Sequence, residues 1–200
     1  MVLGREIKKY DDYKDNYLEI FKYVITKKSS TQRFPDNEEF GLKVVQKDIY
    51  NFKSKLFLLE QLENYDNKER VDVENLISNK TLTIEHIMPQ KLKPIWRKSL
   101  GSNYEKIQEK YLHTLGNITL TGYNSKLSNK SFIEKRDMEK GFKESRLFLN
   151  KSLHSLGCWT EKEIINRANG LRDRALKIWT FPNSEYQSAE DNLKTFLSLF

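Results

Sequence analysis

Two residues capable of chemistry, Glu85 and His86, stand side by side at the end of a short apolar run, and two asparagines, Asn117 and Asn124, bracket a second one. A neutral histidine accepts a proton from water readily, because its pKa lies close to neutral pH. Carboxylate and amide oxygens are the ligands that a hard cation such as Mg²⁺ prefers. Phosphodiester hydrolysis needs both an activated water and a cation that stabilises the developing charge. The pattern therefore predicts a metal-assisted hydrolytic site, with His86 addressing the water and Glu85 and Asn124 offering oxygen ligands.

This prediction makes a geometric demand at the acid–histidine pair. Successive side chains of a strand point to opposite faces, so Glu85 and His86 serve one site only if the backbone bends there. A Glu-His pair also arises often by chance, which leaves an incidental pair as an alternative. The other histidines, His113 and His154, have no acidic neighbour in the sequence. We expect His113 to be structural or exposed on a helix, and Cys158, the one cysteine, to be buried as lone cysteines usually are.

Basic residues gather around these motifs. Positions 81–150 hold 13 Lys or Arg and 7 Asp or Glu, whereas positions 1–80 are electrically neutral, within a net charge of +7. One cluster follows the histidine and one follows the second asparagine: Lys91, Lys93, Arg97 and Lys98, then Lys126, Lys130, Lys135 and Arg136. Such a patch suggests a polyanionic substrate, because phosphate contacts supply most non-specific affinity for nucleic acids. On charge alone, a merely solvated lysine-rich surface is an equally good interpretation.

The composition narrows the class of protein. Charged residues make up 32% and hydrophobic residues 38% of 200 positions, which suits a polar globular chain of one domain or two small ones. A span needs about 18 consecutive apolar residues, and the sequence has no such run, so we expect no contact with a membrane. The N-terminal residues do not have the pattern of a signal peptide. One cysteine excludes a disulfide framework and a cysteine zinc site within the monomer, and a cytoplasmic location fits.

The elements that must position the motifs are mostly helical. Apolar spacing predicts helices over 10–30, 42–64, 102–113, 125–149 (in pieces) and 160–179, and short strands over 82–87 and 117–121. Thr160 and Glu163 have the spacing of a capping box and should open the last long helix. Pro89 and Pro94 should break regular structure after the first strand. We therefore expect a predominantly helical α+β fold.

The same patterns predict three parts. Residues 1–80 are interpreted as a helical lead-in that packs on the next part and holds no chemistry of its own, since they contain no histidine. Residues 81–182 hold the motifs and the long helix that follows them. Residues 183–200 form an amphipathic tail with apolar residues near its end.

Taken together, the motifs resemble the C-terminal HNH-type domain of GmrSD-like restriction endonucleases. The resemblance rests on segments Ile84–Gln90, Leu115–Thr121 and Asn124–Asn129, on Phe132, Lys135 and Arg136, and on Trp159–Ala168 with Ile178 and Trp179. It covers about residues 80–180 and is far more specific than any one of its pieces. It implies a small ββα-metal core, also called a His-Me finger, at about residues 82–140.

The resemblance also implies roles for the motif residues. His86 takes the position of the general base, and Glu85 that of the acidic metal ligand just before it. Asn117 corresponds to the asparagine that tethers the loop between the strands and so orients the histidine. Asn124 takes the last metal position, contributed from the start of a helix. An asparagine there favours Mg²⁺ or Mn²⁺ over softer metals.

Further positions match less directly. Asn129 and Lys135 correspond to residues that support the site or contact phosphate, and we add Lys126 and Arg136 from the basic cluster as nucleic-acid contacts. The chain has no cysteine pairs to brace the core with zinc, so helices must hold the site. The gap between the two motif halves is long for an HNH domain and should carry an inserted helix around 102–113.

The activity implied is that of a metal-dependent DNA endonuclease, the nuclease part of a modification-dependent restriction system in antiviral defence. Similar full-length proteins have an upstream nucleotide-dependent domain that helps to sense modified DNA, so such a domain or subunit, and DNA that is possibly modified, are the expected partners. This chain has no Gly-rich phosphate loop. Two alternatives stay open: a DNA-binding module without catalytic activity, and a helical interaction domain in which the Glu85-His86 pair is incidental.

Overall fold

The computed structural model describes residues 2–29 and 33–198 and divides the chain into two units. The larger unit comprises Phe40–Trp179. The smaller unit joins Met1–Glu39 to Thr180–Phe200. Residues 40–80 therefore belong with the segment that carries the motifs, rather than with the N-terminal helices.

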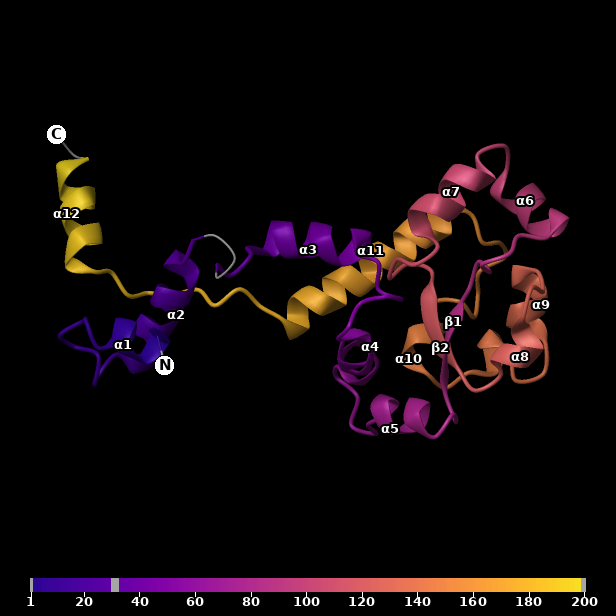
Figure 1. The fold of residues 1–200 in the computed structure, drawn as a ribbon, viewed down its shortest axis with the longest axis horizontal. Coiled ribbons are helices and arrows are strands. Elements are labelled where there is room, and N and C mark those ends of the chain that lie inside the picture. The colour runs from indigo at the N-terminus through magenta and orange to yellow at the C-terminus, as the bar shows by residue number, and fades with distance from the viewer. Residues whose placement is uncertain (1, 30–32, 199–200) are drawn as a thin grey trace. The chain divides into compact units, whose positions relative to one another are not determined.

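A two-stranded antiparallel sheet lies within the larger unit (Figure 1). Strand β1 (Thr83–His86) pairs with β2 (Ile118–Thr121), so that Ile84 lies opposite Leu120 and His86 opposite Ile118. All residues of β2 are buried, and α10 packs on this strand. Helix α8 packs on β1. The prediction of two short strands is confirmed, and the fold is α+β and predominantly helical.

Short helices surround this sheet and carry its apolar contacts. Their bounds are α3 (Asn37–Gln46), α4 (Lys55–Asn64), α5 (Val73–Ser78), α6 (Pro94–Leu100), α7 (Tyr104–Tyr111), α8 (Asn124–Leu127), α9 (Phe132–Asp137), the 3-10 helix η2 (Phe142–Glu144), α10 (Phe148–Lys151) and α11 (Glu161–Ile178). One apolar core joins β2 to α4, α10 and α11. A second core joins the residues that follow β1, Ile87 and Met88, to α6, α7 and α9. The segment leaving β1 is thus anchored apart from the strand itself.

The helix predicted over 42–64 is wrong, because two helices occupy this region. Helix α3 ends at Gln46 and α4 begins at Lys55. Between them Ile49 is fully buried, and its backbone N–H donates to the carbonyl of His113 at 2.8 Å. This tertiary contact, made to a residue far along the chain, ends the helix where the local pattern alone would continue it. The loop 47–54 is therefore fixed against the second half of the motif region.

Proline and serine positions explain the other short helices. Pro94 opens α6 instead of breaking structure, since a proline at the first helical position has no N–H to leave unpaired. The predicted helical stretch 125–149 is indeed in pieces. It breaks at Ser128, whose φ of 41° lies in the left-handed region, and a capping box between Ser131 and Glu134 restarts it as α9.

Helix α11 begins as predicted and braces the start of β2. Thr160 and Glu163 form its capping box. The buried guanidinium of Arg167 donates to the carbonyls of Leu115, Gly116 and Leu149 at 2.8–3.0 Å. A Cβ on Gly116 would lie 2.5 Å from the carbonyl oxygen of Ile164, so only glycine allows this close approach. The long helix therefore fixes the backbone just before Asn117.

The smaller unit contains α1 (Val2–Ile7), α2 (Tyr17–Lys27) and α12 (Ala189–Leu197). Three tyrosines, Tyr10, Tyr23 and Tyr186, meet edge to face, and the hydroxyl of Tyr23 donates to Asp191 at 2.5 Å. Helix α2 lies within the helix predicted over 10–30. None of the helices in the described ranges 2–29 and 33–198 has the length and apolar character that crossing a membrane requires.

Candidate active site

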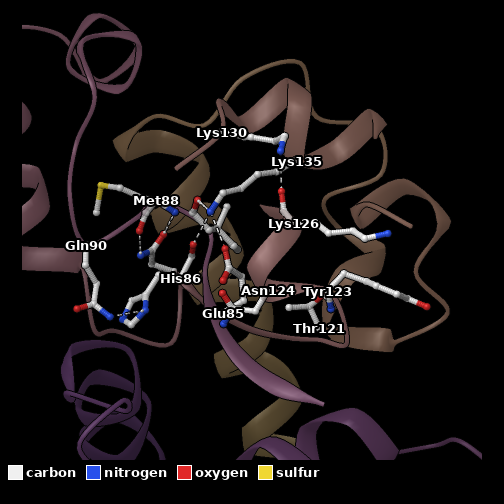
Figure 2. A network of polar contacts seen from close by, with 12 residues as sticks. Glu85, His86, Met88, Gln90, Thr121, Tyr123, Asn124, Lys126, Lys130 and Lys135 are labelled. Atoms are coloured by element: carbon white, nitrogen blue, oxygen red, sulfur yellow. Dashed lines mark hydrogen bonds and ion pairs between the residues drawn. The ribbon is translucent and has the colours of Figure 1, made fainter. Parts of the chain in front are cut away.

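A cavity of about 190 Å³ opens where β1 ends, and the motif residues from both halves of the sequence line it. Four residues predicted to act at the site line it together: Glu85, His86, Asn124 and Asn129. Tyr50, Pro89, Gln90 and Ser128 complete much of the wall. Figure 2 shows Glu85 beside Asn124, with His86 and Gln90 on the other side of the strand end. The sequence segments 84–90 and 124–129 therefore form one site.

The backbone bends just after the acid–histidine pair, at Ile87 and Met88, whereas Glu85 and His86 themselves both belong to the paired strand β1. The Nζ of Lys135 donates to the carbonyl oxygens of His86 and Ile87 at 3.0 and 3.1 Å. Successive carbonyls of a regular strand point in opposite directions, so one ammonium reaches both only where the strand has ended. Glu85 and His86 both line the cavity at this strand end.

Lys135 also holds the carboxylate of Glu85. Its Nζ lies 2.6 Å from Glu85 Oε1, and both side chains are buried, with exposed fractions of 0% and 6%. Burial raises the pKa of Glu85, and the charge of Lys135 opposes that rise. The ammonium uses all three N–H donors on oxygen acceptors inside the protein, so we describe the pair as ionised. Lys135 faces inward and is fully buried, so its ammonium is not exposed for the phosphate contact that we expected of it.

His86 is a neutral histidine held by another one. Its Nε2 lies 3.0 Å from Nδ1 of His113, its Nδ1 lies 3.5 Å from Nε2 of Gln90, and the ring of Tyr50 lies 4.6 Å away between centroids. Burial, together with the nearby His113 and Lys135, lowers the pKa of His86 to about 4. The ring is therefore neutral near pH 7, with one nitrogen carrying a lone pair that can accept a proton, and this low pKa makes it a weaker base than a free histidine.

His113 and Tyr50 are site residues that sequence reasoning missed. The histidine was expected to be structural or exposed on a helix, and residues 1–80 were expected to hold no chemistry. His113 instead lies just past the end of α7, with its ring against His86. The one sequence signal was its place four residues before Asn117, at the far end of the same motif.

Asn117 ties the two segments that flank the cavity. Its Oδ1 accepts from the N–H of Met88 at 2.7 Å and from the indole N–H of Trp159 at 3.2 Å. Its Nδ2 donates to the carbonyls of Met88 and Leu112 at 3.0 and 2.9 Å. The side chain is fully buried and does not line the cavity, so it acts on the site through the backbone.

Two oxygen atoms in the cavity are available to a cation. The amide of Asn124 donates to the carbonyl of Ile84 at 3.1 Å, which directs the side chain along β1. Within the described segments, Glu85 Oε2 and Asn124 Oδ1 accept no hydrogen bond. No group of three or more His, Cys, Asp or Glu in those segments has the arrangement of a metal centre. A carboxylate and an amide oxygen are of the kind that Mg²⁺ takes, since this ion keeps several waters and usually binds one or two carboxylates plus a substrate phosphate.

The basic residues divide into exposed and internally bound ones. Lys126 is exposed on α8, with its ammonium 6.0 Å from the ring of Tyr123, and Lys140 lies 5.5 Å from the same ring. Arg136 is half-buried, and its guanidinium donates to the carboxylate of Asp137 and to a backbone carbonyl, so it is already engaged by other groups of the chain. Of the predicted nucleic-acid contacts, Lys126 is at the surface and Asn129 lines the cavity.

The lone cysteine differs from its prediction as well. Cys158 is exposed, whereas its neighbour Trp159 is buried and stacks on Phe132 at 5.3 Å between ring centroids. The indole of Trp159 is buried in the core, where its N–H donates to Asn117, and the thiol of Cys158 is exposed. The expectation of a buried cysteine was therefore wrong, and no site chemistry involves it.

Comparison with known proteins gives one match. The family model for the C-terminal domain of GmrSD restriction endonucleases matches residues 34–174, which is most of the chain and includes every residue of the cavity. No curated protein and no solved structure was found to match.

Proposed function

The chain belongs to the family of the C-terminal domain of GmrSD restriction endonucleases, and on that premise we propose that it is a metal-dependent DNA endonuclease of the HNH type. The observation that carries the proposal is the convergence of Glu85, His86 and Asn124 on one cavity at a bent strand end. The order of β1, β2 and α8, with α6 and α7 inserted between the strands, supports the assignment of a ββα core. The proposal assigns the catalytic work to this cavity.

The residues divide the work by their chemistry. Glu85 and Asn124 hold Mg²⁺ or Mn²⁺ through one carboxylate and one amide oxygen, and the bound ion supplies charge stabilisation at the phosphate and at the leaving oxygen. His86, kept neutral by its burial, takes the proton of the attacking water. Lys135 orients the carboxylate of Glu85, and Asn117 holds the segment that follows β1.

The substrate and the setting follow from the same premise. In this proposal Lys126, exposed on α8 with Asn124, contacts a phosphate of the substrate, and Asn129 supports the cavity wall. We assign the protein to the cytoplasm as the nuclease part of a restriction system directed against foreign, possibly modified DNA. In this proposal an upstream nucleotide-dependent domain or subunit selects the target.

One observation favours a second function. The ammonium of Lys135 already neutralises the Glu85 carboxylate and would repel a cation at the same site. A chain in which this ion pair keeps the metal out would be a DNA-binding module without cleavage. Its affinity for DNA would depend on exposed basic residues such as Lys126, and would fall steeply with added salt.

Plasmid nicking separates the two functions. Supercoiled plasmid is incubated with the full chain and Mg²⁺ or Mn²⁺, beside an EDTA control, His86→Ala and His154→Gln, a matched change at a histidine outside the cavity. We expect metal-dependent nicking that His86→Ala lowers by about 10²–10⁴-fold and that His154→Gln leaves unchanged. Nicking that survives in His86→Ala refutes the assignment of the base. Salt-sensitive DNA retention without nicking, together with no binding of Mn²⁺ in calorimetry, supports the binding module instead.

A further inference from the structure

The nitrogen of His86 that faces the proposed water is decided by its neighbours. Two ring nitrogens have two different partners, His113 at 3.0 Å and Gln90 at 3.5 Å. The shorter contact is the firm one, and 3.5 Å is at the limit of a hydrogen bond. Gln90 lines the cavity, so Nδ1 of His86 lies on the cavity side, where a water can take the place of the loose amide contact.

We propose that His113 is a positioning residue of the site, which holds His86 in the tautomer protonated at Nε2 and so leaves Nδ1 as the basic nitrogen toward the cavity. The inference rests on the proposed function, and it adds to it a residue that no part of the motif assigns. In this arrangement the water proton passes to Nδ1 of His86 while the Nε2 proton stays in its hydrogen bond to His113.

One assignment of tautomers gives each of the two contacts of His86 a donor and an acceptor, and the proposal adopts it. Nδ1 of His86 faces the amide nitrogen of Gln90, which can only donate, and this assigns the acceptor role to Nδ1. A neutral imidazole then carries its proton on Nε2, which donates to Nδ1 of His113. His113, accepting at Nδ1, carries its own proton on Nε2. All three partners are satisfied by this one assignment.

The loop 47–54 holds His113 in place. The backbone carbonyl of His113 accepts hydrogen bonds from the N–H groups of Ile49 and Tyr50 at 2.8 and 3.3 Å. The ring of Tyr50 stacks on His113, with 5.3 Å between centroids and 18° between planes, and also contacts His86. Both imidazoles are therefore clamped by one aromatic ring, and His113 has little freedom to turn away. A partner held in this way can set the orientation of the catalytic ring, as the groups behind metal-bound histidines do.

Two substitutions at His113 make a matched pair. In His113→Asn, the Oδ1 atom takes about the place of Nδ1 and still accepts a hydrogen bond. In His113→Phe, the ring volume remains but the acceptor is gone. Because the chain has only three histidines, the third, His154, serves as the internal reference in the spectra and His154→Gln as the control variant.

The first readout is the tautomer of His86, from long-range proton–nitrogen spectra of the ¹⁵N-labelled full chain. We expect a proton on Nε2 of His86 in the wild type and in His113→Asn, and a mixture of tautomers in His113→Phe. A wild-type His86 protonated on Nδ1, or a tautomer unchanged in His113→Phe, overturns the inference. This measurement needs no metal and no activity.

The second readout is the rate of nicking. We expect kcat in His113→Phe to fall about 10–100-fold with KM nearly unchanged, because His113 does not touch the substrate, and we expect His113→Asn to recover most of it. Equal rates in wild type and His113→Phe overturn the inference. A wild type that does not nick with either metal ion refutes the proposed function, and the tautomer spectra then decide on His113 alone.

Discussion

Replacing Lys135 with methionine removes the one cation that is buried against the bent end of β1. The change keeps most of the side-chain volume but leaves three acceptors without their donor: Glu85 Oε1 and the carbonyls of His86 and Ile87. Breaking a buried ion pair by removing one partner costs about 3–5 kcal/mol, because the remaining charge is left uncompensated. Total stabilities are about 5–15 kcal/mol, so the loss is a large part of the whole. We expect Lys135→Met to lower the free energy of unfolding by about 3–5 kcal/mol.

Urea unfolding followed by tryptophan fluorescence measures this loss, since Trp159 is fully buried in the same core. A double-mutant cycle with Glu85→Gln isolates the pair, and we expect a coupling free energy of about 1–3 kcal/mol. Lys130→Met is the matched control, an exposed lysine five positions away that should change stability by less than about 0.5 kcal/mol. A loss below 1 kcal/mol in Lys135→Met (about the effect of an exposed pair), or strict additivity with Glu85→Gln, would show that the buried ion pair does not hold this bend.

Three further predictions concern other contacts. Gly116→Ala should cost about 1–3 kcal/mol in urea unfolding, because its Cβ would meet the carbonyl of Ile164, and an unchanged midpoint would refute that close approach. Asn117→Ala should lower the free energy of unfolding by about 2–4 kcal/mol, because four hydrogen bonds are lost. It should also abolish nicking; urea unfolding checks the first expectation and the plasmid assay the second. Asp191 has its pKa lowered, chiefly by the hydroxyl of Tyr23, so its contribution is present near neutral pH and is lost as the pH falls through the folded-state pKa. Hydrogen-exchange protection of α12 should therefore decrease in acid, and Asp191→Asn should lack this decrease.

Local signals were enough to predict the elements that carry the motifs. The two strands are short apolar runs, and α11 has both a capping box and a regular apolar face. These features depend on residues close together in the sequence. The convergence of Glu85, His86 and Asn124 depends instead on the pairing of β1 with β2, because an antiparallel pair of strands brings the motif at the end of one strand beside the residues that follow the other.

Other features depend on distant contacts that no local pattern encodes. The break after Gln46 exists because Ile49 packs and bonds against His113, a residue more than sixty positions away. Lys135 looks like any member of a basic cluster, yet it is buried on Glu85, fifty positions earlier. His113 has no acidic neighbour in the sequence that would mark it as a site residue. Its partners in the structure are another histidine and a tyrosine from loop 47–54. The division between surface and interior was therefore the least predictable part of the site.

The bend after β1 is held at three successive residues by side chains from two other elements. Lys135 takes the carbonyls of His86 and Ile87, and Asn117 takes both backbone groups of Met88. The ordering entropy of this turn is therefore lost when the chain folds, and little of it remains to be lost when an ion or a phosphate arrives. Binding at the cavity should for this reason show a small entropic penalty from the protein, and the geometry of His86 should be the same before and after it. The contacts that stabilise the bend after β1 thus also keep the cavity in the geometry that binding requires.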